Sequence, residues 1–297
     1  MRLKPTYSNR PMPARRPTGL ETLTQPIKRA IVGKVVAVFN DQSRGETPVV
    51  RRPDGLFGPR AVAWRVNGDV TSMMVGGVAG LMMQMLHPAV LGGVWDHSRF
   101  RDDMRGRLRR TARFIALTTY GDKAEAMAII ERVRQIHTAV RGVLPDGTAY
   151  AADDPDLLAW VHVTETVCFL DAWIRYAEPG MTIIDQDKYF DEMAVVAVAL
   201  GADPVPRSRR EATKLMRQMR PALRHDARTR EVAHILQNQP ADNFASESFQ
   251  ALTMQAAVDL LPDWALRMHN LGNPLLARPL VRAGTFGVAQ TLRWAFR

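Results

Sequence analysis

A histidine inside an apolar helical pattern is the first candidate for chemistry in this sequence. In RVRQIHTAVRG (132–142), His137 lies within a stripe whose spacing is that of a buried helix face. The stripe consists of Ala126, Ile129, Ile130, Val133, Ile136 and Val140. Arg134 and Arg141 lie within side-chain reach of the histidine along that face, and Gly142 is expected to end the helix.

Three roles are open to His137. It could be a core residue satisfied by one hydrogen bond, a general acid or base, or a ligand to a metal or haem. The neighbouring arginines would suit the two propionates of a haem, because guanidinium groups bind carboxylates through paired hydrogen bonds. The plainer alternative is that Arg134 and Arg141 are solvated residues at the rim of a helix.

A second candidate site lies in RLRRTARFIALTTYG (107–121). An inner face is expected from Leu108, Thr111, Ala112, Ile115 and Thr119. Thr111 would then point inward, with Arg107 one turn earlier and Arg110 on the flank, and form a polar spot opposite a ligand. Alternatively, the Thr111 hydroxyl bonds back to its own helix and the arginines face solvent.

Three other residue groups have simpler expected roles. His97, in WDHS, precedes an expected helix start and is a candidate cap or loop residue. His162 and Glu165 would form half of a carboxylate-bridged di-iron site, but the sequence lacks the second Glu-x-x-His set and the further carboxylates. Cys168 is expected to be a small buried residue rather than a thiolate ligand of haem.

Composition narrows the class of protein. The 297 residues contain one cysteine, which excludes an internal disulfide framework and is compatible with a cytoplasmic protein. Residues 1–60 carry 12 basic and 4 acidic side chains, whereas the other 237 residues carry 28 and 26. The excess charge therefore lies near the start of the chain, and no nucleic-acid surface is expected on the body. The most apolar segment, 73–86, is too short to span a bilayer.

The pattern of apolar residues predicts an all-α protein. A basic arm and a short helix over 26–40 occupy residues 1–45, and a single large helical domain is expected over 46–297. Helices are expected to begin near Asp69 and Asp154 and to span 103–120 and 123–141. Further helices are expected over 185–201, 208–219, 227–237 and 245–261, and within 270–297.

The order of several sequence blocks resembles the MpaB-type oxygenases, a family that includes the catalytic domain of the latex-clearing rubber oxygenases. The resemblance covers roughly residues 55–265. Its blocks read LFGPRAVAWRVNGDV, GGVAGLMMQMLHPAVLGGVWDHSRF, RLRRTARFIALTTYG, RVRQIHTAVRG and the run over 150–162, followed by DQDKYFDEM and LLPDWALRM.

The resemblance implies a globin-like helical core that holds haem b. The proximal iron ligand would be His137, and Arg107 and Thr111 would lie on the distal side and donate hydrogen bonds to dioxygen. Arg141 would suit a propionate. Rubber-cleaving members can place a lysine on the distal face, where this chain has Arg110, and a guanidinium has no lone pair to offer iron. The sixth position would then hold water, stay open or take another group such as His97.

These inferences lead to an oxygenase that uses dioxygen on a small, apolar organic substrate. Cleavage of a carbon–carbon double bond is implied by the resemblance, while monooxygenase and peroxidase reactions suit the same residues. The alternative is a non-catalytic helical binding or regulatory protein whose basic arm contacts acidic lipid or nucleic acid. Both functions are compatible with a cytoplasmic protein that contacts a membrane peripherally through this arm.

Overall fold

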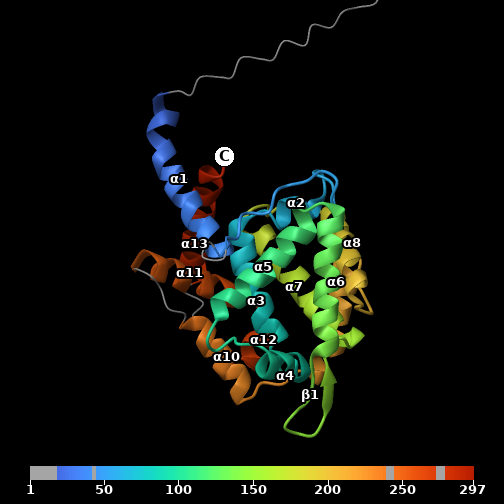
Figure 1. Ribbon diagram of the computed structural model, residues 1–297. Coiled ribbons are helices and arrows are strands. Elements are labelled where there is room, and N and C mark those ends of the chain that lie inside the picture. Colours follow the sequence, from blue (N-terminus) through green and yellow to red (C-terminus); the bar gives the residue numbers. More distant parts are fainter. Residues whose placement is uncertain (1–18, 42–44, 239–243, 272–277) are drawn as a thin grey trace, which may run out of the picture.

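The computed structural model describes residues 19–41, 45–238, 244–271 and 278–297 of the chain (Figure 1). Most of these residues are helical, which confirms the all-α class. The expected arm falls largely on residues 1–18, which lie outside the described residues. The helices are α1 (Gly19–Phe39), α2 (Val62–Val66), α3 (Val70–Gln84), α4 (Pro88–His97), α5 (Met104–Tyr120), α6 (Lys123–Ala139), α7 (Pro155–Tyr176), α8 (Ile183–Leu200), α9 (Arg209–Met219), α10 (Ala227–Gln237), α11 (Phe244–Leu260), α12 (Asp263–Met268) and α13 (Arg278–Ala295). A short 3-10 turn (Arg220–Ala222) follows α9.

Side-chain caps begin several of these helices where the sequence predicts them. The carboxylate of Asp69 accepts a hydrogen bond from the backbone of Ser72 at the start of α3. Asp103 caps α5 in the same way, and Asp154 caps α7 directly before Pro155. Each cap satisfies backbone N–H groups that have no partner within the helix, which is why the helices begin at these residues.

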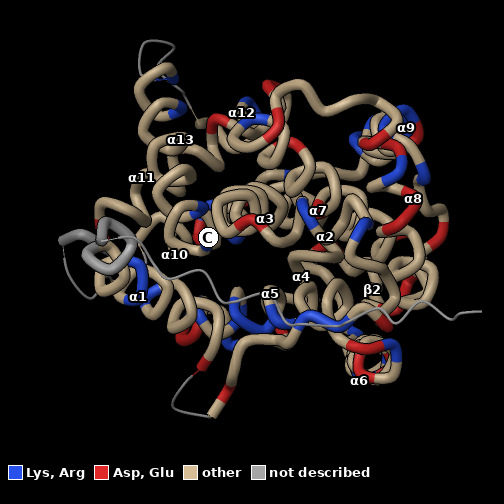
Figure 2. The backbone as a smooth tube through the Cα atoms, turned by 90° about the horizontal axis from the view of Figure 1, so that it is seen from above, with Lys and Arg blue, Asp and Glu red and all other residues tan. Residues whose placement is uncertain are grey.

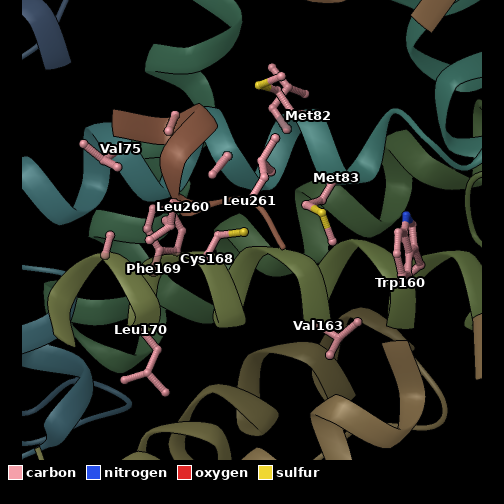
Figure 3. Packing of buried hydrophobic residues seen from close by; sticks show 14 of the residues in the cluster. Val75, Met82, Met83, Trp160, Val163, Cys168, Phe169, Leu170, Leu260 and Leu261 are labelled. Atoms are coloured by element: carbon pink, nitrogen blue, oxygen red, sulfur yellow. The ribbon is translucent and has the colours of Figure 1, made fainter. Parts of the chain in front are cut away.

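The centre of the fold is the pair α3 and α7, which pack closely along their length (Figure 3). Gly76 and Gly80 permit this approach, since a Cβ atom at Gly76 would lie 2.8 Å from the Cα atom of Phe169. Cys168 is buried in this interface, and burial raises the pKa of its thiol. A neutral, buried thiol is the expected small core residue and not a thiolate ligand.

The other helices surround this pair. Helices α8 and α9 pack against α7, whereas α11 and α13 pack against α3. Helices α5 and α6 pack on each other and lie together on one side of the central pair (Figures 1 and 2). The candidate residues of the sequence therefore fall mainly on the layer formed by α5 and α6.

Helix α13 is attached to the core by ion pairs. The carboxylate of Asp259 on α11 is 1% exposed and is bound by three guanidinium groups, those of Arg175, Arg278 and Arg282. Near the other end of α13, Arg293 lies 2.7 Å from the carboxylate of Asp69 and donates to the carbonyl oxygen of Tyr176. The last described helix is thus part of the same packed unit as α3, α7 and α11.

Two helix boundaries differ from those that the sequence predicts. Helix α1 begins at Gly19 and includes Pro26 in its interior, so it starts before the expected residue 26. Helix α6 ends at Ala139, because Val140 is extended and Gly142 belongs to a strand. The strands β1 (Arg141–Val143) and β2 (Ala149–Ala151) form an antiparallel hairpin in which Gly142 lies opposite Tyr150.

The apolar stripe of α6 is buried only in its first half. Ala126 and Ile130 are buried, as the sequence predicts, but Ile136 is 52% exposed near the end of the helix. The last turn of α6 is therefore less covered by the rest of the fold than its first half. His137 lies in this last turn.

Helix α7 is long and apolar enough to cross a membrane, as is the bent pair of α3 and α4 taken together. Most of the apolar window of α7 is buried inside the fold, where α3, α8 and α9 cover it. Length and apolar composition are also what the central helix of a helical domain requires, so these segments are weak evidence for a membrane span.

Candidate functional site

Helices α5 and α6 form an antiparallel pair joined by Gly121 and Asp122. Gly121 ends α5, and the Asp122 carboxylate forms a capping box with Glu125 at the start of α6. Arg107 and His137 lie nearly equal numbers of residues from this link, on either side of it. They are therefore placed toward the same, open end of the pair, where the two helices diverge (Figure 1).

His137 is half-buried and forms no side-chain hydrogen bond with the described residues. Its Nδ1 atom is fully buried and has no partner. Burial lowers the pKa of His137, with the charge of Asp153 acting in the opposite direction. The ring is therefore neutral near pH 7, and a neutral imidazole offers a nitrogen lone pair that a metal can accept.

Arg107 is the one arginine of the candidate site that is largely buried without a counterion among the described residues. Burial lowers the pKa of Arg107 to about 10, and the charge of Arg110 contributes in the same direction. Arg109, on the same helix, instead donates to the carbonyl oxygens of Ala37 and Val38. A desolvated guanidinium without a partner is costly, so the position suits an anionic ligand group.

Thr111 is exposed, and its hydroxyl donates to the carbonyl oxygen of Arg107 at 3.3 Å. Of the two alternatives for Thr111, the structure therefore shows the hydrogen bond within its own helix. Arg110 is also exposed and pairs with Asp103 at 3.3 Å. Among the described residues, no hydrogen bond or ion pair joins Arg107, Arg110 or Thr111 to His137.

The remaining expected residues lie around the end of α6, and each has a partner. Arg134 pairs with Glu131 on the solvent face at 3.5 Å. Arg141 pairs with Asp153 at 2.8 Å. His97 is the last residue of α4, not a residue before a helix start, and its Nε2 atom lies 3.0 Å from the carbonyl oxygen of Arg141. The structure thus brings His97 and Arg141 together in one contact.

A second group of titratable residues lies on α7 and was not assigned to the site from sequence. Burial raises the pKa of Glu165 to about 7 and lowers the pKa of His162 to about 4. The Glu165 carboxyl has no hydrogen bond to the described residues, and the Nε2 atom of His162 is buried without a partner. Both residues retain some accessible surface.

The sequence signal for this group was the i, i+3 spacing of His162 and Glu165 in an otherwise apolar helix. That spacing was considered only as half of a di-iron site. In the part of the chain that the structure describes, no group of three or more His, Cys, Asp or Glu residues is arranged to hold a metal ion. A separate cavity between α3, α11 and α13 has about 10 Å³ of space, which is room for one water and not for a cofactor.

One of three comparisons with known proteins gives a match. A family model described as the catalytic domain of ER-bound oxygenase mpaB/B′ and rubber oxygenase matches residues 64–294. The match begins in α2 and ends within α13, so it extends past the end of the sequence resemblance near residue 265. No curated protein and no solved structure matches the chain.

Proposed function

Since the chain belongs to the family of ER-bound oxygenase mpaB/B′ and rubber oxygenase catalytic domains, we propose that it is a haem b-dependent oxygenase. Its substrates in this proposal are dioxygen and a small, apolar organic molecule. The observation that supports haem most directly is that His137 and Arg107 both lack partners within the described residues and lie toward one end of a helix pair.

The chemistry of these two residues fits a haem. His137 would bind the iron through a nitrogen of its neutral ring. In place of the distal role that the resemblance implies, Arg107 would bind a propionate carboxylate, an anion that the described residues do not provide. A neutral imidazole and an uncompensated guanidinium are the two protein groups that a haem with ionised propionates requires.

Haem supplies the activation of dioxygen when it is bound, while the chain supplies binding, orientation and protons. Thr111 can turn its hydroxyl away from the Arg107 carbonyl and donate to a polar group on the distal side. Arg110 has no lone pair for iron and would remain with Asp103. His97 would hold the strand after α6 in place through the Arg141 carbonyl and would not act as a ligand.

Glu165 on α7 would be a separate candidate for proton transfer. A carboxyl group whose pKa is about 7 is present in both protonation states near neutral pH, so it can accept a proton from a substrate and return it. Glu165 also has no hydrogen bond to the described residues that would hold it in one state. His162, one turn earlier on α7, would be neutral near pH 7 because burial lowers its pKa to about 4.

The test is the absorption spectrum of the full chain produced with ample haem. We expect a Soret band with one haem per chain, and we expect its loss in His137→Ala. His234→Ala is the matched control, because His234 is an exposed histidine at the end of another helix and should leave the band unchanged. A His137→Ala protein that keeps stoichiometric haem would contradict the assignment.

A further inference from the structure

The exposed side of α9 carries a row of positive charges that the fold does not neutralise. Arg210, Lys214 and Arg217 are spaced as i, i+4 and i+7, which places them on one face of the helix. All three are exposed, and none forms an ion pair or hydrogen bond with another described residue. We call these three residues the α9 row.

The α9 row borders an open groove between α8 and α9 of about 470 Å³. The groove is lined by Ile183, Asp187, Arg209, Arg210, Thr213, Lys214 and Arg217. Its one carboxylate, Asp187, accepts a hydrogen bond from the backbone of Arg209 at 2.8 Å, and the Arg209 side chain pairs with Asp171 at 2.6 Å. The groove lining therefore keeps a net positive charge, because the three cations of the α9 row face one carboxylate.

Two large apolar side chains are exposed beside these charges. Ile183 and Ile184 form the start of α8, and they are 62% and 80% exposed. Ile183 lines the groove itself, and Ile184 follows it in the chain. Two acidic residues of α8 are neutralised elsewhere, since Asp185 pairs with Arg65 and Asp191 pairs with Arg207. Figure 2 shows α8 and α9 side by side at one edge of the fold.

Exposed aliphatic side chains bordered by free cations suit one kind of partner in particular. We propose that this face of α8 and α9 binds the surface of an anionic lipid bilayer. Ile183 and Ile184 would enter the boundary between headgroups and acyl chains, and the α9 row would contact lipid phosphates and carboxylates. Nucleic acid would use the cations but gains little from two isoleucines, since its bases stack on aromatic side chains. This inference is independent of the proposal that the chain binds haem.

The experiment measures sedimentation of the full chain with vesicles of phosphatidylcholine and phosphatidylserine, and with phosphatidylcholine alone. We expect binding to the anionic vesicles that weakens with salt. The triple variant Arg210→Glu, Lys214→Glu, Arg217→Glu should lower the partition coefficient by about 100-fold or more, because each basic residue contributes about fivefold at an anionic surface. The paired variant Ile183→Ser, Ile184→Ser should lower it by about tenfold or more at unchanged charge.

A charge-matched control separates the effect of this face from the effect of net charge. Lys123→Glu, Arg132→Glu, Arg230→Glu changes the same number of exposed cations elsewhere and should bind as the parent chain does. Circular dichroism verifies that each variant is folded. Equal loss in the control and in the α9 variant would overturn the proposal, as would unchanged binding in both. Binding of duplex RNA that needs the α9 row, without vesicle binding, would also overturn it.

Discussion

The Nε2 atom of His97 lies 3.0 Å from the carbonyl oxygen of Arg141, and this contact joins the end of α4 to the strand that follows the His137 helix. His97→Ala should lower the free energy of unfolding by about 1 kcal/mol, the usual contribution of one hydrogen bond. Chemical denaturation measures this change. The Soret band should keep its position and intensity, so a large spectral shift would show that His97 binds iron.

Arg107→Met should separate the stability of the cofactor-free protein from its affinity for haem. Removing a desolvated guanidinium that lacks a partner should leave the free energy of unfolding unchanged or raise it by about 1 kcal/mol. Haem affinity should fall by about tenfold or more, because a charge-assisted hydrogen bond is lost. Haem titration and urea unfolding measure the two effects. Arg110→Met, at an exposed ion pair, should change both only slightly.

Glu165→Gln should alter the dependence of stability on pH. The pKa of Glu165 is raised to about 7 in the folded chain, so the folded state binds this proton more tightly than the unfolded state. The stabilisation is complete below the ordinary carboxyl pKa and is lost as pH rises through about 7. Between these two pH values the free energy of unfolding of the parent chain should fall by up to about 3 kcal/mol, and that of the variant should not show this fall. Unfolding at pH 5 and pH 8 tests this difference.

The same variant tests the proposed proton transfer. Glu165→Gln cannot accept a proton, so turnover should fall by about 100-fold or more. Haem content should remain that of the parent chain, which distinguishes a proton-transfer role from a structural one. Turnover that is unaffected, or a pH profile that does not change near neutrality, would remove Glu165 from the mechanism.

Two glycines of α3 offer a matched test of the central helix pair. A Cβ atom at Gly76 would overlap the backbone of Phe169, whereas one at Gly80 would lie 3.5 Å from the Cα atom of Glu165. Gly76→Ala should therefore destabilise the fold by about 2 kcal/mol through overpacking. Gly80→Ala should be neutral or stabilising by up to about 1 kcal/mol, since alanine favours the helix. Thermal unfolding of the two variants should rank them in this order.

The sequence predicted helix starts better than it predicted the surroundings of the candidate residues. Asp69 and Asp154 were identified because a cap depends on a few neighbouring residues. Gly142 was misread as a helix stop, because its pairing with Tyr150 depends on a strand that follows several residues later. The apolar spacing around Ile136 was likewise a helix property and did not reveal which neighbour covers it.

The same distinction holds at the candidate site. His137 was found from its local pattern, but its lack of a hydrogen-bond partner is a property of the folded chain. Folding also determines that Arg141 pairs with Asp153 and that Arg107 has no counterion among the residues the structure describes. Glu165 was visible by its spacing, yet its desolvation follows from the packing of α7 within the fold.

The ion pair between Asp69 and Arg293 links residues that are synthesised 224 positions apart. Asp69 caps α3, one of the two central helices. It is synthesised long before Arg293 of α13, its partner in the folded chain. The ribosome therefore exposes a nascent chain in which this carboxylate and Asp259 still lack cations that α13 supplies. The ion pairs of Asp69 and Asp259 are therefore completed only after α13 has been synthesised.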